Sequence, residues 1–427
     1  MSNKCQIIGV LDNGVESLSA PALAALKSAD LVIAAKRTLA LLADTIVDAE
    51  HKALTGNLSK TPEWIGKALT KHKQVVVLAT GDPLCHGIGS YLRKKLGAEK
   101  LHIMPNTSTI QLAFAKIAVA WQDAKICSVH TKDAGEWELG ADAEHGLYAL
   151  LQAISQHDKL AVLTSPDNDP ARIARMLVTQ EMDDLFDMVV AENLLCADEK
   201  IFQTMSVARL GSESFSGNDV VILLRKKPQK PKLLFGYADE VFKQRKPDKG
   251  LITKREVRAV SLAKMQLCSD SIVWDIGAGS GSVGIEAAKL CRDGHVYAVE
   301  KNAADFAIAR ENARNFGLHN YSLIKNKAPV GMCDWPAPNA VFIGGSGGEL
   351  SELIALCLAL LQTDGCLVMN FVTLENMNTA LTALKQSEAT WDITQLQASR
   401  SQPILHMNRM RAENPVWIVS AQKGALT

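Results

Sequence analysis

The sequence lacks several features that define special classes of protein. No apolar run in its 427 residues reaches the ~18 residues that cross a bilayer, and residues 1–5 lead straight into an apolar run without a signal-peptide pattern. The nine cysteines contain no C-x-x-C pair, and the ten histidines contain no H-x-x-x-H spacing. We therefore expect no membrane segment, no structural metal and a cytoplasmic protein with reduced thiols.

A net charge is also absent, because 46 lysines and arginines balance 46 acidic residues. This balance argues against wholesale binding of nucleic acid. The length predicts two or three domains, each large enough to bury a full core.

A glycine-rich loop in the second half is the most informative stretch of the sequence. The apolar run 271–274 reads as a strand, Asp275 closes it, and a helical pattern follows the loop. The next apolar run ends at Glu300, roughly twenty residues further on, where such folds place an acid against ribose hydroxyls. The residues expected to surround the cofactor at this loop are Asp275, Gly277, Gly279, Ser280, Gly281 and Glu300.

The glycine spacing distinguishes between nucleoside cofactors. A dinucleotide calls for G-x-G-x-x-G, whereas the third glycine here, Gly281, comes one residue early. The acid Asp275 suits a cofactor that carries an ammonium group and no phosphate, and S-adenosylmethionine (SAM) is such a cofactor. A strand-turn-helix without any ligand is the structural alternative.

The first half predicts a parallel sheet, since buried apolar runs at 4–10, 31–35 and 74–80 alternate with helical patterns. Ligands of such sheets collect at the carboxyl ends of strands, where two hydroxyl- or glycine-rich turns lie. These turns contain Gly81, Asp82, Thr107, Ser108 and Thr109. Each has a structural alternative, a common Gly-Asp-Pro turn and a helix cap.

The pattern of strands restarts after residue 121, which predicts two lobes, about 1–120 and 121–225, with a cleft between them. The basic, proline-containing stretch 226–232 is the expected linker, and 233–427 the second domain. Lys254, Arg255 and Arg258 gather just before the glycine loop, a group that a polycarboxylate substrate would need. Thr253 and Glu256 have the spacing of a capping box.

The first half resembles the tetrapyrrole (corrin) methylases, in particular those that methylate C5 of a precorrin ring. The matching stretches are 79–83 with 87–89, 107–113, 121–124, 128–130 and 192–194. Three positions depart from the family pattern: the first turn 9–14, Pro105-Asn106 in place of Pro-Gly, and His130-Thr131-Lys132 in place of His-Gly-Arg. The resemblance implies that SAM binds between the two lobes.

The second half resembles the decarboxylating C15 methyltransferases of corrin synthesis through 252–258, 274–282, 299–300 and 342–346. The resemblance implies a Rossmann-like SAM domain with a seven-strand sheet, so the whole chain is an α/β protein. It also implies that Lys254, Arg255 and Glu256 act on the substrate. Cofactor contacts are expected at Lys327, Ala328, Gly344 and Gly345.

The two resemblances together imply a bifunctional enzyme of cobalamin (vitamin B12) synthesis with two SAM per chain. It would methylate C5 and C15 of a precorrin and remove the ring-C acetate as CO2. A homo-oligomer is expected. Three alternatives stay open: a cobalt-containing substrate, a first half that only binds the tetrapyrrole, and a nucleic-acid methyltransferase, although the sequence shows no N-P-P-[YF] motif.

Overall fold

The computed structural model describes residues 4–141, 143–217, 219–228, 233–245, 252–345 and 348–424. The expected linker residues 229–232, and Ser346 of the 342–346 motif, lie outside this set. The chain divides into two compact units, Met1–Ala141 with His145–Gln229 (unit 1) and Lys230–Thr427 with Asp142–Glu144 (unit 2). Each unit is treated by itself.

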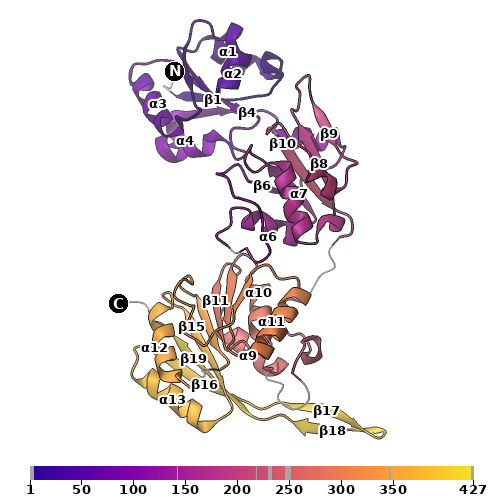
Figure 1. The fold of residues 1–427 in the computed structure, drawn as a ribbon. Coiled ribbons are helices and arrows are strands. Elements are labelled where there is room, and N and C mark those ends of the chain that lie inside the picture. The colour runs from indigo at the N-terminus through magenta and orange to yellow at the C-terminus, as the bar shows by residue number, and fades with distance from the viewer. Residues whose placement is uncertain are drawn as a thin grey trace. The chain divides into compact units, whose positions relative to one another are not determined.

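The first lobe of unit 1 is a parallel five-stranded sheet in the order β3-β2-β4-β1-β5. Its strands are β1 (Cys5–Val10), β2 (Leu31–Ala34), β3 (Glu50–Ala53), β4 (Val75–Thr80) and β5 (Leu101–Met104). Its helices are α1 (Ala20–Lys27), α2 (Lys36–Leu41), α3 (Thr61–Thr70), α4 (Ile88–Leu96) and α5 (Thr109–Lys116). Two separate apolar clusters include alternate residues of β1, so both faces of the sheet are covered. The strand pairings confirm the parallel sheet expected from the sequence, and Figure 1 shows this lobe at the N-terminal end of the chain.

The second lobe of unit 1 has the strand order β6-β7-β10-β8-β9. The strands are β6 (Lys125–Ser128), β7 (Lys159–Leu163), β8 (Phe186–Glu192), β9 (Lys200–Phe202) and β10 (Asp219–Arg225). The helices are α6 (Tyr148–Gln156), α7 (Pro170–Thr179) and α8 (Val207–Leu210). Only β6 and β7 pair in parallel, and the other neighbours are antiparallel. The parallel sheet predicted for the first half of the chain is therefore wrong for this lobe.

Unit 2 is built on a seven-stranded sheet in the order β13-β12-β11-β14-β15-β19-β16, which confirms the expected strand layout. The strands are β11 (Ile272–Ile276), β12 (His295–Val299), β13 (Tyr321–Ile324), β14 (Ala340–Ile343), β15 (Cys366–Phe371), β16 (Thr390–Leu396) and β19 (Val416–Gln422). The helices are α9 (Arg255–Lys264), α10 (Ser282–Leu290), α11 (Ala303–Asn315), α12 (Leu350–Leu360) and α13 (Leu374–Lys385). The first five strands run parallel, and β19 is antiparallel to both its neighbours.

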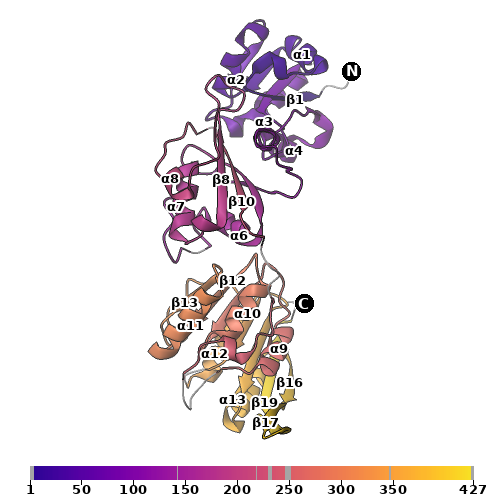
Figure 2. The same ribbon diagram turned by 90° about the vertical axis from the view of Figure 1, so that its right-hand side faces the viewer.

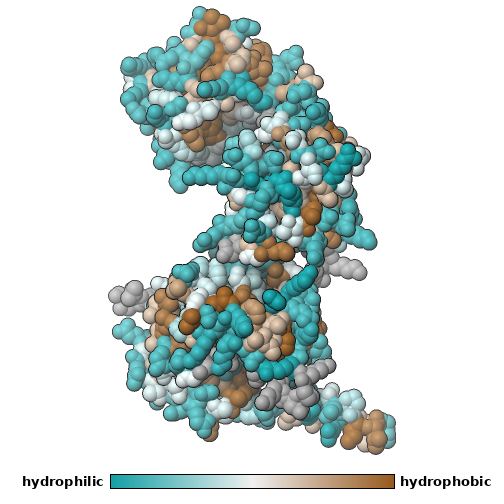
Figure 3. All heavy atoms as spheres, viewed as in Figure 1, coloured by the Kyte–Doolittle hydropathy of each residue, from teal (hydrophilic) through white to brown (hydrophobic). Residues whose placement is uncertain are grey.

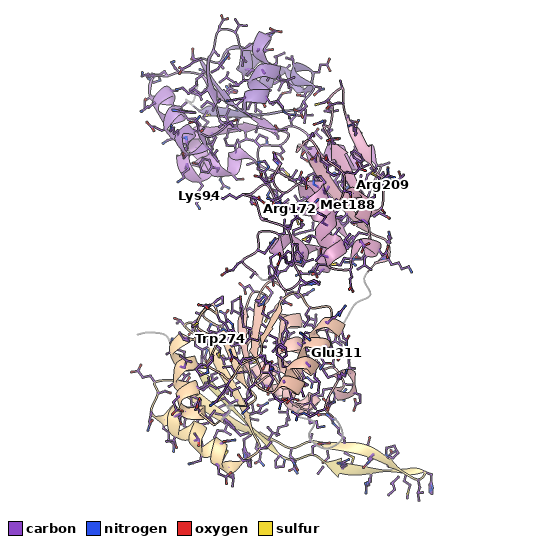
Figure 4. The ribbon with its side chains drawn as sticks, viewed as in Figure 1. Lys94, Arg172, Met188, Arg209, Trp274 and Glu311 are labelled. Carbon is purple, nitrogen blue, oxygen red and sulfur yellow. The ribbon has the colours of Figure 1, made fainter. Side chains whose placement is uncertain are left out.

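Helices cover both faces of this sheet, as Figure 2 shows. Residues of β11 alternate between the faces: Trp274 packs in the core beside α12 and α13, whereas Val273 packs beside α9 and α10. Trp274, labelled in Figure 4, is 1% exposed. Because side chains of a strand point alternately to its two faces, Asp275 lies on the same face as Val273, toward α10.

A two-stranded hairpin, β17 (Ser399–Ile404) with β18 (Met407–Ala412), leaves the sheet between β16 and β19. The hairpin was not predicted from the sequence, which led us to expect only a seven-strand sheet in this half of the chain. Figure 1 shows the hairpin extending away from the rest of unit 2, and Figure 3 shows apolar side chains near its far end. Leu405 in its turn is 90% exposed, and Ile404, Met407 and Met410 are exposed as well.

Candidate active site

A cavity of about 630 Å³ lies at the carboxyl ends of the parallel strands of unit 2. Its walls come from the glycine loop after β11, the turns after β12, β13 and β14, the start of α9 and the base of the hairpin. Strand ends of open parallel sheets are where ligands bind. The volume is of the size that holds a small-molecule ligand.

The glycine loop needs its glycines for conformation and for space. Gly277, Gly279 and Gly281 all have positive φ, of 72°, 57° and 78°. A Cβ atom on Gly277 would lie 2.5 Å from the carbonyl oxygen of Gly345, so only glycine lets the turns after β11 and β14 meet. Gly277, Gly279, Gly344 and Gly345 line the cavity, as the sequence analysis expected of a ligand-facing loop.

Glu300 closes β12 at the edge of the cavity and is tied to the glycine loop. One carboxylate oxygen accepts a hydrogen bond from the Gly279 backbone nitrogen at 2.9 Å, and the other accepts one from the Asn302 nitrogen at 2.7 Å. The residue is 7% exposed and lines the cavity. The carboxylate is thereby placed at the strand end where an acid can meet a ribose.

Asp275 lies behind the cavity and is not one of its lining residues. It is 1% exposed, and its Oδ2 accepts a hydrogen bond from the Gly284 nitrogen at 3.1 Å, while Oδ1 has no partner. Burial raises the pKa of Asp275 to about 7. Ser280 and Gly281, also expected at the cofactor, are not among the lining residues either.

The basic group before α9 separates into three different environments. Lys254 lines the cavity, Arg255 is exposed outside it, and Arg258 is fully buried. Arg258 bonds Glu286 at 2.8 Å and Asp239 at 3.2 Å, so a substrate-binding role for Arg258 is wrong.

The capping-box interpretation of Thr253 and Glu256 is also wrong. Lys254 is the N-cap residue of α9, without a side-chain hydrogen bond to the helix. Glu256 lines the cavity, and its carboxylate is held by Arg400, which lowers the pKa of Glu256 below its ordinary value. The hydrogen bonds to this guanidinium replace the bonds that a capping box would make.

Lys327 and Ala328, after β13, line the cavity as expected, and Lys327 is paired with Glu349 at 2.6 Å. Six further lining residues were not predicted from the sequence: Arg245, Lys301, Leu396, Ala398, Glu413 and Asn414. Arg245 is held by Asp305. Lys301 directly follows Glu300, and this position beside a recognised motif was the one available signal.

The expected site residues of unit 1 come together at the carboxyl ends of β4 and β5. A Cβ atom on Gly81, whose φ is +67°, would lie 3.3 Å from the Cα of Ser108 and from the nitrogen of Thr109, and 3.4 Å from the carbonyl oxygen of Thr107. Asp82 accepts a hydrogen bond from the Leu84 nitrogen at 2.9 Å and so stabilises its own turn. Ser108 caps α5 in a capping box, which confirms the structural alternative for this hydroxyl.

Asn106 fills the space beside the first turn of unit 1. Its side-chain amide donates to the carbonyl oxygens of Gly9, at 3.2 Å, and Ser17, at 2.8 Å. A Cβ atom on Gly9 would lie 2.1 Å from the carbonyl oxygen of Gly81 and 2.8 Å from the Cβ of Asn106. The three turns are therefore packed directly against one another.

Among the described residues, no group of three or more His, Cys, Asp or Glu side chains could hold a metal ion. No helix in the same set is long and apolar enough to cross a membrane.

Comparison with known proteins gives a separate match for each half of the chain. A model described as tetrapyrrole (corrin/porphyrin) methylases matches residues 4–208, and one described as precorrin methyltransferase domain matches residues 244–423. The boundary between the two matches falls in the segment that contains the expected linker.

Individual relatives match most of the chain or less than half of it. The precorrin-6Y C(5,15)-methyltransferase [decarboxylating] of Sinorhizobium sp. is 28% identical, over 86% of this chain and 84% of its own. The cobalt-precorrin-6B C(15)-methyltransferase (decarboxylating) of Salmonella typhimurium is 38% identical, over 40% of this chain and 89% of its own. A solved precorrin-6y C5,15-methyltransferase structure from Geobacter metallireducens is 37% identical, covers 45% of this chain and 100% of that chain, and has a TM-score of 0.43.

Proposed function

The chain belongs to the precorrin-6Y C(5,15)-methyltransferase (decarboxylating) family of SAM-dependent methyltransferases, and we propose on that basis that it methylates C5 and C15 of precorrin-6Y and decarboxylates the ring-C acetate. The observation that carries the proposal is the glycine-lined cavity of unit 2, which lies where such folds bind a nucleoside cofactor and has a lysine on its wall. We assign C15 methylation and decarboxylation to unit 2, which contains the expected domain 233–427, and C5 methylation to unit 1, which contains most of the expected domain 1–225.

In unit 2 the turns at the strand ends would hold SAM. The close approach of Gly277 to Gly345 leaves a bare backbone, and Glu300 is fixed at the end of β12 as a hydrogen-bond acceptor for ribose hydroxyls. Lys327 and Ala328 would border the adenine. When bound, SAM supplies a methyl group on a sulfonium, which needs neither a metal nor a covalent nucleophile.

The remaining wall of this cavity would meet the tetrapyrrole. Ile252, Leu396 and Val416 provide apolar surface suited to a flat ring, and Lys254 provides a cation for a carboxylate on its rim. Transfer of a methyl cation to a meso carbon leaves the ring positively charged, and loss of CO2 from the acetate returns an electron pair that removes this charge. The protein's task is then mainly to orient the ring, an effect that can supply several kcal/mol.

Unit 1 would hold the second SAM of the chain, at the turns that contain Gly81 and Thr107–Thr109. A second candidate function for unit 1, binding the tetrapyrrole without methylating it, is favoured by Asn106. Its side chain occupies space beside Gly9 and Gly81, where glycine would leave room. A count of SAM sites separates the two candidates: two per chain support methylation by unit 1, and one supports the binding role.

A cobalt-precorrin substrate is the second candidate for the whole chain, favoured by the name of the 38% identical relative. We also propose a homo-oligomer, because an isolated two-stranded hairpin with exposed apolar residues is only marginally stable by itself. A cytoplasmic location suits the nine cysteines, all of which are free thiols.

The test is incubation of the purified chain with precorrin-6Y or its cobalt complex and SAM labelled in the methyl group. The proposal expects label on C5 and C15 and release of CO2. Parallel assays of precorrin-6Y and of its cobalt complex identify the preferred substrate by comparing their kcat/KM values. Absence of label from both rings would refute the proposed function.

A further inference from the structure

Arg400 lies on β17, at the base of the hairpin, and reaches back to two acidic residues of the body of unit 2. Its Nε and Nη2 donate to the two carboxylate oxygens of Glu256, at 3.1 and 2.5 Å, and its Nη1 donates to Asp239 Oδ2 at 2.8 Å. The guanidinium is 29% exposed, Glu256 is 32% exposed and Asp239 is 3% exposed. The pair with Glu256 is bidentate, the geometry in which arginine holds a carboxylate most firmly.

This contact connects the hairpin to the elements that form the cavity. Glu256 lies in the first turn of α9 and lines the cavity. Ala398, before β17, and Glu413, after β18, line the same cavity. Asp239 is shared with Arg258, which bonds Glu286 on α10, the helix that follows the glycine loop. Through Asp239 and Arg258, Arg400 is therefore connected to α10, the helix that follows the glycine loop.

The position of Arg400 in the hairpin is unfavourable in itself. Its cross-strand partner in the β17–β18 ladder is Arg411, and like charges directly opposite one another destabilise a strand pair. Arg411 is exposed, whereas Arg400 is turned toward Glu256 and Asp239. The contacts to these two acids offset the repulsion.

Glu256 poses an electrostatic problem that Arg400 resolves. A carboxylate on the wall of a cavity repels a substrate that carries many carboxylates, and Arg400 keeps this carboxylate ionised by lowering its pKa. The same guanidinium, shared with Asp239, places a positive charge against the Glu256 carboxylate and so weakens its repulsion of the substrate. Arg255 is a second cation near Glu256, but it is exposed and lies outside the cavity lining.

We propose that Arg400 is a positioning residue for the tetrapyrrole in unit 2, acting through Glu256: it orients this carboxylate on the cavity wall and neutralises it toward a polycarboxylate substrate. The inference rests on the proposed function of unit 2. It assigns Arg400 to the substrate side of the site, with no direct part in binding SAM.

The test compares Arg400→Met with Arg411→Met, which removes the cross-strand arginine of the same hairpin. The readouts are kcat and KM for C15 methylation, SAM affinity, and C5 methylation by the same chains. Arg400→Met should raise the KM for the tetrapyrrole about tenfold or more and leave SAM affinity unchanged, whereas Arg411→Met should leave all readouts unchanged. Arg400→Lys, which keeps a charge without the fork, should fall between.

The decisive variant is the double substitution Arg400→Met with Glu256→Gln. If Arg400 acts by neutralising Glu256, removal of the carboxylate should return the KM to within about threefold of that of Glu256→Gln alone. A double variant as impaired as Arg400→Met would overturn the inference and reduce Arg400 to a support of the fold. Failure of the wild type to methylate C15 would instead refute the proposed function, and the two failures are thus distinguishable.

Discussion

Ionisation of the buried Asp275 should lower the free energy of unfolding of unit 2 as the pH rises, and Asp275→Asn should remove this effect. The carboxyl group is 1% exposed, its Oδ1 has no hydrogen-bond partner, and burial raises its pKa from 3.8 to about 7. A raised carboxyl pKa means that ionisation disfavours the folded state. The cost is nearly absent below pH 4, grows as the pH rises, and is complete above pH 7, where about three pKa units correspond to about 4 kcal/mol.

The amide of the variant cannot ionise, and its oxygen can still accept the hydrogen bond from the Gly284 nitrogen. We therefore expect the free energy of unfolding of Asp275→Asn to exceed that of the wild type by an amount that grows with pH. The growth from pH 5 to pH 8 should be about 2 to 3 kcal/mol. Urea unfolding followed by pulsed hydrogen exchange of peptides from unit 2 measures this difference. Asp293→Asn, at an exposed position of the same unit, is the control. A difference between Asp275→Asn and the wild type that stays constant across this pH range would refute the reasoning.

Three further outcomes follow from the same structure. Gly277→Ala should abolish SAM binding in unit 2 and destabilise this unit by about 2 kcal/mol or more, because a Cβ at φ +72° meets Gly345. Calorimetry and urea unfolding measure the two effects, and unchanged SAM binding would contradict this. Lys254→Met should raise the KM for the tetrapyrrole about tenfold while exposed Arg255→Met does not, and equal effects would show that the cavity wall is assigned wrongly. Asp219→Asn should stabilise unit 1 only above about pH 4, with full effect above pH 6, because burial and Glu192 raise the pKa of Asp219 to about 6; a gain of the same size at pH 4 in urea unfolding would argue against it.

The glycine loop and Glu300 could be predicted because local spacing determines them. A strand, three glycines and an acid one strand later occupy adjacent positions of a parallel sheet whatever the rest of the chain does. The same local reasoning placed Asp275 at the cofactor. Its true position depends on which face of β11 meets α10, and that is decided by packing.

The wall of the cavity that contains Glu256 could not be predicted, because it is assembled from distant segments. Arg400 meets Glu256 across 144 residues of sequence. The spacing of Thr253 and Glu256 suggested a helix cap, and the pairing with Arg400 overrides that local signal.

In the second lobe of unit 1, apolar runs identified the strands, yet the run of residues 219–225 does not reveal that β10 pairs antiparallel with both its neighbours.

We propose that one chain carries out two methyl transfers, one in each unit. The most direct measurement is mass spectrometry and NMR of the product formed from precorrin-6Y, or its cobalt complex, with 13C-methyl SAM, by the wild type and by Gly277→Ala. We expect labelled methyl groups at C5 and C15 with the wild type, and at C5 alone, without loss of CO2, with the variant. A wild-type product labelled at only one carbon, or a variant that still labels C15 normally, would contradict it.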